Sequence, residues 1–309
     1  MRIPVIIDCD PGHDDAIALL LAFASPTIYV QAVTVVAGNQ ALEKTLKNAK
    51  NVLDYAGIRA KVAAGAQKPL FRELNIASHV HGESGLDGVI LPPAKFEEVE
   101  ITAVELMREI ILKSNEKVVL IATGPLTNVA LLLLTYPVVK DKIEYISLMG
   151  GACFGGNLTP VAEFNIAVDP EAAKIVFESG IPIVMHGLDV TYKAQIYRDE
   201  VETIRKLGGK VPIMAAELLD FYSKYYGNQG FKGTPLHDAC AVAYVIDPTL
   251  FQVKHLHVDI ETRGEFTNGE TVVDYYNITG KLKNAKVAFD IDRKRFIDIL
   301  VKALQMYQK

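Results

Sequence analysis

The chain contains no tryptophan, and its 309 residues include only three cysteines, Cys9, Cys153 and Cys240. These cysteines are widely separated and odd in number, and no two have the CxxC spacing of zinc and redox sites. The pattern indicates neither a disulfide framework nor a structural zinc site. Because neighbouring acids raise the pKa of a thiol, we do not expect Cys9 to act as a nucleophile.

The sequence also lacks long apolar runs and an excess of positive charge. The run from Val129 to Leu134 is too short to cross a bilayer, and the amino terminus shows neither a basic leader nor an apolar signal region. A net charge of −5 and a pI near 5.8 give no electrostatic indication of binding to nucleic acid or to an anionic membrane surface. We therefore expect a cytoplasmic protein that acts on a small molecule.

No linker, low-complexity tract, charge block or internal repeat divides the chain. Half of the residues are apolar, enough to bury one large core. We therefore expect residues 1–309 to form a single domain.

Segments with strand periodicity alternate with segments of helical periodicity along the first 185 residues. The predicted strands cover residues 3–7, 29–36, 61–64, 117–122, 143–149 and 181–185. The predicted helices begin near residue 14 and cover 42–55, 102–113, 126–134 and 170–179. This alternation predicts an α/β fold with an open, mainly parallel twisted sheet flanked by helices. Later segments predict helices over 212–226, 238–246 and 292–307, and a small antiparallel element from strands at 255–260 and 271–277.

Four acids crowd the turn between the first strand and the first helix: Asp8, Asp10, Asp14 and Asp15. Asp14 could simply cap the helix and Asp15 interact with its dipole, but these roles explain only two of the four. Like charges this close repel one another unless a cation or a proton intervenes, and hard divalent cations prefer oxygen ligands. The turn is therefore a candidate metal site at the carboxyl end of a strand.

Other polar groups follow other predicted strands. If the sheet is parallel, the loops at their ends meet along one edge and can form a common pocket. Considered singly, the asparagines could be turn residues and Asp238 a helix cap. The sequences concerned are Gly38-Asn39, Thr123-Gly124-Pro125-Leu126-Thr127-Asn128, Met149-Gly150-Gly151, Asn157, Glu163-Phe164-Asn165 and His237-Asp238.

These residues resemble the nucleoside hydrolases of the inosine-uridine-preferring family. The specific amino-terminal signature of that family, DxDPGxDD, is present as residues 8–15, and the other segments follow in the family's order over nearly the whole chain. The resemblance implies a Ca²⁺ site made of Asp10, Asp15, Asp238 and the main-chain carbonyl of Thr123. It also implies hydrolysis of the N-glycosidic bond of ribonucleosides to free base and ribose, and assembly as a homodimer or homotetramer.

In the mechanism that the resemblance implies, Asp10 is the general base for a Ca²⁺-bound water that attacks the ribose C1′, and His237 is the candidate donor to the departing base. We expect His79 to be a loop residue and His13 only to border the site. Tyr222 and Tyr226 share a helix face and are the expected aromatic contacts. The expected substrate-binding residues are Asp14, Asn39, His81, Met149, Asn157, Glu163, Phe164, Asn165, Tyr222, Tyr226 and His237.

The base preference stays open among uridine, cytidine and inosine. Purine-specific relatives are expected to stack indole rings on the base, and this chain has no tryptophan. Two rival functions also stay open. An Mg²⁺-dependent aspartyl-phosphate phosphatase would use the Asp8-x-Asp10 pair, but Gly12 stands where its threonine is expected. A non-catalytic Ca²⁺-dependent nucleoside or sugar binder would use the same pocket without turnover.

Overall fold

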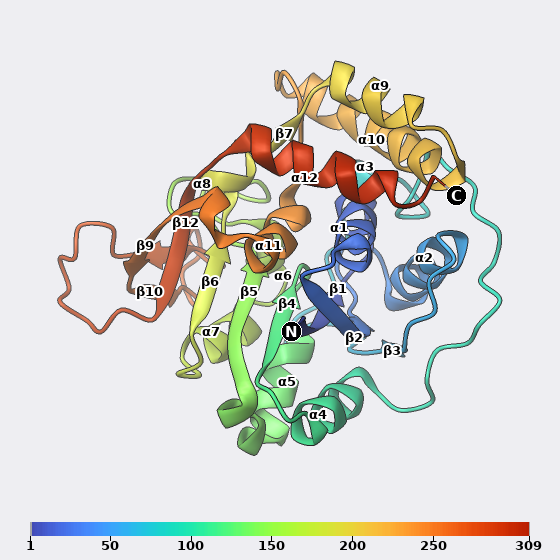
Figure 1. Ribbon diagram of the computed structural model, residues 1–309. Coiled ribbons are helices and arrows are strands. Elements are labelled where there is room, and N and C mark those ends of the chain that lie inside the picture. Colours follow the sequence, from blue (N-terminus) through green and yellow to red (C-terminus); the bar gives the residue numbers. More distant parts are fainter. Residues whose placement is uncertain (1, 309) are drawn as a thin grey trace.

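A computed structural model describes residues 2–308 and contains a central eight-stranded sheet in the order β3-β2-β1-β4-β5-β6-β12-β9 (Figure 1). All neighbouring strands are parallel except β9 and β12, which pair antiparallel. The predicted parallel sheet is therefore confirmed. Its strands are β1 (Ile3–Cys9), β2 (Ile28–Val35), β3 (Val62–Ala64), β4 (Val118–Ala122), β5 (Ile143–Met149), β6 (Ile183–His186), β9 (Phe251–Leu256) and β12 (Ala285–Ile291).

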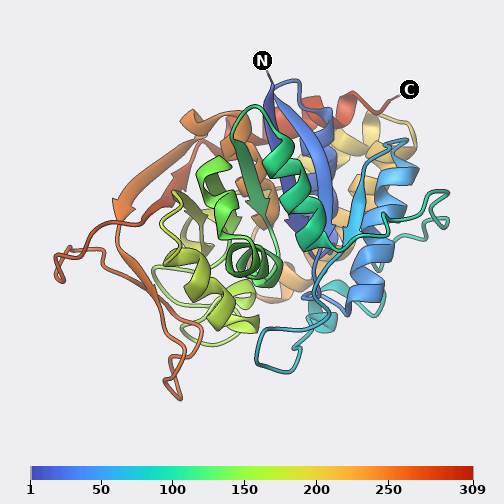
Figure 2. The ribbon, with the colours of Figure 1, turned by 90° about the horizontal axis from the view of Figure 1, so that it is seen from below.

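Helices cover both faces of the sheet (Figures 1 and 2). Val5 and Ile7 of β1 point into one apolar core and Ile6 into the other, so the strand is buried on both sides. The first core is closed by α1 (His13–Ala24), α2 (Leu42–Tyr55), α9 (Arg198–Lys206), α10 (Lys210–Asn228), α11 (His237–Ile246) and α12 (Arg293–Gln305). The second core is closed by α4 (Ala103–Lys113), α5 (Thr127–Thr135) and α7 (Pro170–Phe177).

The late part of the chain differs from its prediction. The segment expected as one strand over 255–260 is divided between β9, in the main sheet, and β10 (Val258–Ile260). The expected antiparallel element is present, because β10 pairs with β11 (Thr271–Val273). Strand β12 and helix α9 were not predicted. Apolar and polar residues are mixed at the end of β12, in the sequence Ala288-Phe289-Asp290-Ile291, unlike the apolar runs of the buried parallel strands. Its place in the main sheet is therefore known only from its position between β6 and β9.

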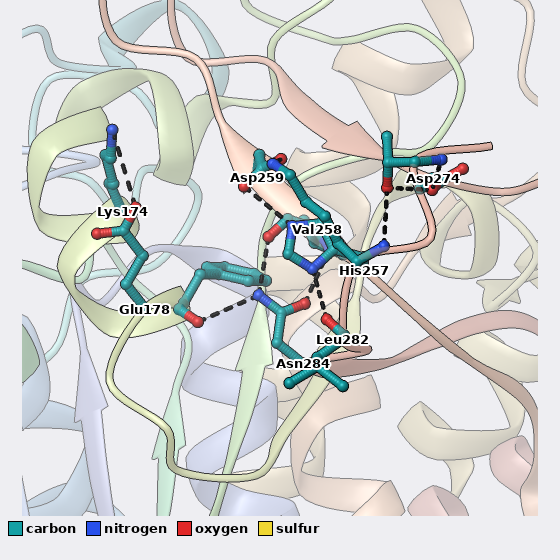
Figure 3. Close-up of polar contacts among 11 residues, drawn as sticks. Lys174, Glu178, His257, Val258, Asp259, Asp274, Leu282 and Asn284 are labelled. Atoms are coloured by element: carbon teal, nitrogen blue, oxygen red, sulfur yellow. Dashed lines mark hydrogen bonds and ion pairs between the residues drawn. The ribbon is translucent and has the colours of Figure 1, made fainter. Parts of the chain in front are cut away.

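Residues 257–284, here called the arm, project from one edge of the sheet and are held at their base by polar contacts (Figure 3). The Asn284 amide donates to the carbonyls of Val258 and Phe177 and accepts from the Val258 N–H. At the first residue of β11, the Thr271 hydroxyl contacts both the N–H and the carbonyl of Ala152. The arm is thus attached to the loop that follows β5, which contributes to the site.

Short elements complete the fold. No helix among residues 2–308 combines the length and the apolar character needed to span a bilayer. The remaining short elements that position the site are α3 (Ser78–His81), α6 (Phe164–Val168), α8 (Leu188–Thr191), β7 (Gln195–Ile196) and β8 (Thr234–Pro235).

Candidate active site

Three carboxylates come together where α1 and α11 begin. Asp14, Asp15 and Asp238 each offer an oxygen, and these oxygens lie within 4.8 Å of one another. Helix α11 packs against α1, which brings Asp238 to the signature turn across more than 220 residues of chain. Asp15 also accepts from the Gly12 N–H at 2.9 Å, so it caps α1 as well as facing the cluster.

Asp10 lies beside this cluster at the end of β1, with its carboxylate fully buried. One oxygen, Oδ2, accepts from the Asn39 N–H at 2.6 Å, whereas Oδ1 is buried without a hydrogen-bond partner among residues 2–308. A Cβ added at Gly38 or Gly124 would lie 2.1 Å or 2.6 Å from the Asp10 oxygens. The glycines that follow β2 and β4 therefore make room for this carboxylate.

Burial raises the pKa of each clustered acid. The pKa values of Asp10 and Asp238 lie well above the ordinary range, first through burial and then through repulsion by neighbouring aspartates. For Asp14, burial and then repulsion by Asp15 raise the pKa to about 7. Buried oxygens that repel one another, one of them unpartnered, fit a hard divalent cation, because such a cation takes six or more oxygen ligands.

Asp8, the remaining acid of the signature, does not join this cluster. Its Oδ1 accepts from the Thr34 hydroxyl at 2.6 Å and from the Asn128 amide at 2.8 Å. Asn128 also donates to the Val35 carbonyl and accepts from the Ala66 N–H. Asp8 therefore ties β1 to β2 and α5, and the role of the sequence Thr127-Asn128 near it is structural.

Thr123 and Asn165 link the carboxylates to the rest of the site. The Thr123 hydroxyl donates to Asp15 at 2.8 Å, and its carbonyl accepts from the Asn165 side chain at 2.7 Å. Asn165 also donates to the Met149 carbonyl at 3.1 Å. The carbonyl expected to bind a metal thus lies at the site and is oriented by Asn165.

Glu163, buried at the start of α6, also lines the pocket that these groups share. It accepts backbone N–H bonds from Gly151, Asn165 and Ile166 at 2.9, 3.0 and 3.2 Å, which caps α6 and fixes the carboxylate. Burial raises its pKa to about 7. The Asn157 side chain accepts from the Phe164 N–H at 2.8 Å and holds the end of the preceding loop beside it.

A pocket opens above these groups and brings together nearly all of the predicted site residues. Asp10 and Asp15 are buried and are not part of the lining. Predicted residues in the lining are Asp14, Asn39, His81, Thr123, Met149, Asn157, Glu163, Phe164, Asn165, Tyr222, Tyr226, His237 and Asp238. The lining residues that were not predicted are Ala77, His79, Val80, Leu158, Tyr192, Tyr225 and Gln229.

Histidines and aromatic rings form the side of the pocket away from the carboxylates. His81 stacks on Tyr222 and on the fully buried His13, with ring centroids 5.3 Å apart in both pairs. His13 also stacks on Phe221 and contacts the Asp87 carbonyl through Nε2 at 2.8 Å. His13 therefore supports His81 from behind. His79, expected to be only a loop residue, lies at the mouth of the pocket against Tyr225.

His237 is held by two hydroxyl groups. Its Nε2 contacts the Tyr226 hydroxyl at 2.6 Å, and its Nδ1 contacts the Thr191 hydroxyl at 2.7 Å. Burial lowers the pKa of the imidazole to about 3, so the ring is neutral near pH 7. Both ring nitrogens are engaged, and both His237 and Tyr226 line the pocket. Thr191 was not singled out in the sequence, because a lone threonine after a short strand carries no motif.

A parallel sheet with buried carboxylates at its strand ends, opening into a polar and aromatic pocket, defines an α/β enzyme that binds a polar small molecule. The profile of the family described as inosine-uridine preferring nucleoside hydrolase matches residues 5–298. The chain belongs to this family. Its activity is that of a ribonucleoside hydrolase, which is an N-glycosyl hydrolase.

Individual relatives cover almost the full chain. It is 53% identical to the pyrimidine-specific ribonucleoside hydrolase RihA of Salmonella typhimurium, over 99% of this chain and 100% of the relative. The Escherichia coli O17:K52:H18 RihA has the same identity and coverage. Among solved structures, the purine-preferring ribonucleoside hydrolase from Gardnerella vaginalis is 32% identical, with a TM-score of 0.93 over 99% of both chains. The plant nucleoside hydrolase PpNRh1 is 29% identical, with a TM-score of 0.92 over 99% of both chains.

Proposed function

We propose that this enzyme hydrolyses the N-glycosidic bond of pyrimidine ribonucleosides and depends on Ca²⁺. The observation that carries the proposal is the cluster of Asp14, Asp15 and Asp238 beside the unpartnered Oδ1 of Asp10. The pyrimidine preference is supported by the 53% identity to enzymes named pyrimidine-specific and by the lack of tryptophan for stacking on a purine. Assembly as a homodimer or homotetramer and a cytoplasmic location stay predictions.

The cation would be held by Asp10, Asp15, Asp238 and the carbonyl of Thr123, and the Asp14 carboxylate lies in the same cluster. Ca²⁺ fits this set because it accepts carboxylate and carbonyl oxygens in a flexible shell. When bound, it supplies positive charge that neutralises the buried acids and lowers the pKa of an adjacent water molecule. Every other step falls to the side chains.

Asp10 is the proposed general base. Its Oδ1 is free to take a proton, and the Asn39 N–H fixes the other oxygen, so the carboxylate has one orientation. As water attacks C1′ of the ribose, positive charge develops on the sugar ring, and the surrounding carboxylates stabilise it. Asn39, Asp14, Glu163 and Asn165 would bind the ribose hydroxyls, with Met149, Asn157 and Phe164 beside them.

The base would lie against His81, Tyr222, Tyr226 and His237. A nucleobase leaves with negative charge, which a hydroxyl donor can reduce by donating a hydrogen bond or a proton. The 2.6 Å contact between the Tyr226 hydroxyl and Nε2 of His237 supports Tyr226 as this donor. His237 thus acts together with Tyr226, since neither ring nitrogen of His237 is free.

A nucleoside panel with and without a chelator tests the proposal. Uridine, cytidine, inosine and adenosine are incubated with the enzyme, and free base and ribose are measured separately. We expect ribose and base in equal amounts, fastest from uridine or cytidine, with activity lost on chelation and restored by Ca²⁺. Equal rates with and without the chelator contradict the metal requirement. Binding without release of ribose contradicts hydrolysis, and faster turnover of inosine contradicts the base preference.

A further inference from the structure

Thr191 is fully buried at the end of α8 and belongs to none of the sequence motifs described above. Its hydroxyl lies 2.7 Å from Nδ1 of His237. Strand β6 ends at His186, and α8 follows directly, so the sheet fixes the position of this hydroxyl. His237 is itself buried, and its second nitrogen contacts Tyr226. The three side chains therefore form one continuous hydrogen-bonded chain from the interior to the pocket.

The order of donors and acceptors in this hydrogen-bonded chain follows from where each hydrogen can be donated. A buried hydroxyl donor requires an acceptor, and among residues 2–308 the Thr191 hydroxyl has only Nδ1 of His237 within hydrogen-bond distance. Thr191 therefore donates to Nδ1. A neutral imidazole that accepts at Nδ1 carries its hydrogen on Nε2, which must then donate to the Tyr226 oxygen.

The next group in the chain is the one that meets the substrate. Because the Tyr226 oxygen accepts from His237, its own hydrogen is directed elsewhere. Tyr222 is the only other partner of that hydroxyl in the described chain, at 3.4 Å, which is long for an O–H···O bond. The Tyr226 hydrogen is thus available to a base in the pocket, which Tyr226 lines.

We propose that Thr191 is a positioning residue that sets the Nε2–H tautomer of His237 and thereby turns the Tyr226 hydroxyl outward as a donor to the leaving base. If the tautomer were reversed, Tyr226 would donate to His237 and present only lone pairs to the base. A leaving base that gathers negative charge would then be repelled rather than stabilised. The inference rests on the proposed function for its catalytic consequence but not for the tautomer itself.

The kinetic test compares Thr191→Val, which keeps the shape and removes the hydroxyl, with Thr191→Ser, which restores it. We expect Thr191→Val to lower kcat for uridine about 10- to 100-fold, the range typical of residues that orient a functional imidazole, and Thr191→Ser to recover most of it. A nitrophenyl riboside, whose leaving group needs no protonation, should change less than about threefold with either variant. KM for uridine should change little.

The control is Thr45→Val. Thr45 is equally buried, on α2, and its hydroxyl donates to the carbonyls of Val36 and Leu42, away from the pocket. It should lower stability as much as Thr191→Val but leave both substrates unaffected. An equal loss with uridine and with the nitrophenyl riboside in Thr191→Val, or no recovery in Thr191→Ser, overturns the positioning role.

The tautomer is measured directly by ¹⁵N NMR of histidine-labelled enzyme, with the His237 signals assigned by their loss in His237→Asn. We expect a protonated Nε2 and an unprotonated Nδ1 in the wild type. A protonated Nδ1 overturns the inference whatever the kinetics show. Because this measurement needs no turnover, it separates failure of the inference from failure of the proposed function, which is shown by the absence of ribose release from every nucleoside.

Discussion

The two halves of the pocket are built by different means. The carboxylate half lies on strand ends, on the first turns of α1 and α11 and at the N-cap of α6, and its groups are held by backbone N–H bonds and by glycines that make room for them. The aromatic half lies on α3, α10 and α11, and its groups are held mainly by one another. The members of the first half are Asp10, Asp14, Asp15, Asp238 and Glu163; those of the second are His81, Tyr222, Tyr226 and His237.

This difference indicates that one part of the fold carries the reaction chemistry and another part carries the specificity for the base. Rigid strand ends suit a reaction that is the same for every ribonucleoside, because the sugar does not vary. Side chains on helices and loops suit the part that differs between substrates. Changes in the carboxylate half should therefore affect all nucleosides alike, whereas changes in the aromatic half should depend on the leaving base.

The largest effect is expected from Asp10→Asn, which removes the proposed base while keeping the hydrogen bond from Asn39. We expect kcat to fall about 10⁴-fold for uridine and for the nitrophenyl riboside alike. Ca²⁺ affinity, measured by calorimetry, should also weaken. Asp8→Asn is the matched control on the same strand, because Asp8 faces Thr34 and Asn128 instead. Hydrolysis that survives Asp10→Asn undiminished would reject the assignment.

The second effect concerns the sugar. Replacing uridine by 2′-deoxyuridine leaves buried ribose-binding groups without a partner, and a site built to bind a hydroxyl can reject the analogue by about 10⁴-fold. We expect about 10³-fold in kcat/KM, since water can enter the vacated space. The ratio of uridine to 2′-deoxyuridine should be the same in the wild type and in Tyr226→Phe. A ratio that changes in that variant would show that the two halves are coupled.

How well each half could be predicted follows from the same difference. The acids of residues 8–15 form a local motif, and a parallel sheet predicts that Asn39, Thr123 and the loop beginning at Gly150, which carries Glu163, lie along one edge. Asp8 is the one acid of residues 8–15 that lies outside the carboxylate half, because its side chain on β1 accepts a hydrogen bond from Asn128. That orientation depends on a partner 120 residues away, which periodicity cannot reveal.

The aromatic half was predicted less completely. Sequence spacing placed Tyr222 and Tyr226 on one helix face, and both line the pocket. Thr191, Tyr192 and Gln229 carried no signal, because their roles arise from tertiary contacts: Thr191 contacts His237 of α11, and Tyr192 and Gln229 line the pocket. In the same way, the engagement of both nitrogens of His237 follows from tertiary contacts alone.

A third prediction concerns Tyr226→Phe, which removes the outward hydroxyl of the aromatic half. We expect kcat for uridine to fall about 10²-fold, with little change for the nitrophenyl riboside. Tyr225→Phe is the matched control, because Tyr225 is the neighbouring residue of the same helix, also lines the pocket, and does not contact His237. If Tyr226→Phe slows both substrates equally, the hydroxyl acts on the fold of the pocket and not on the leaving base.

The last prediction separates the halves by the sign of their pH dependence. Burial and then Asp15 raise the pKa of Asp14 from 3.8 to about 7, so between these values the folded, metal-free enzyme holds a proton that the unfolded chain has lost. The stability from this group is complete below pH 3.8 and is lost as the pH rises toward 7. Burial lowers the pKa of His237 from 6.5 to about 3, so its contribution is complete above pH 6.5 and is lost as the pH falls.

Denaturant unfolding in the presence of a chelator should show these opposite signs. Between pH 5 and pH 7, the free energy of unfolding of Asp14→Asn should rise by up to about 3 kcal/mol relative to that of the wild type. The reason is that each pH unit between the two pKa values changes the stability of the wild type by about 1.4 kcal/mol. As the pH falls from 6.5 to 4.5, the free energy of unfolding of His237→Asn should rise by a similar amount relative to that of the wild type. Ca²⁺ should cancel the advantage of Asp14→Asn at pH 7, because a cation neutralises the carboxylate in place of a proton. If the stability difference from the wild type changes with pH in the same direction for both variants, burial does not shift the pKa values of Asp14 and His237 in opposite directions.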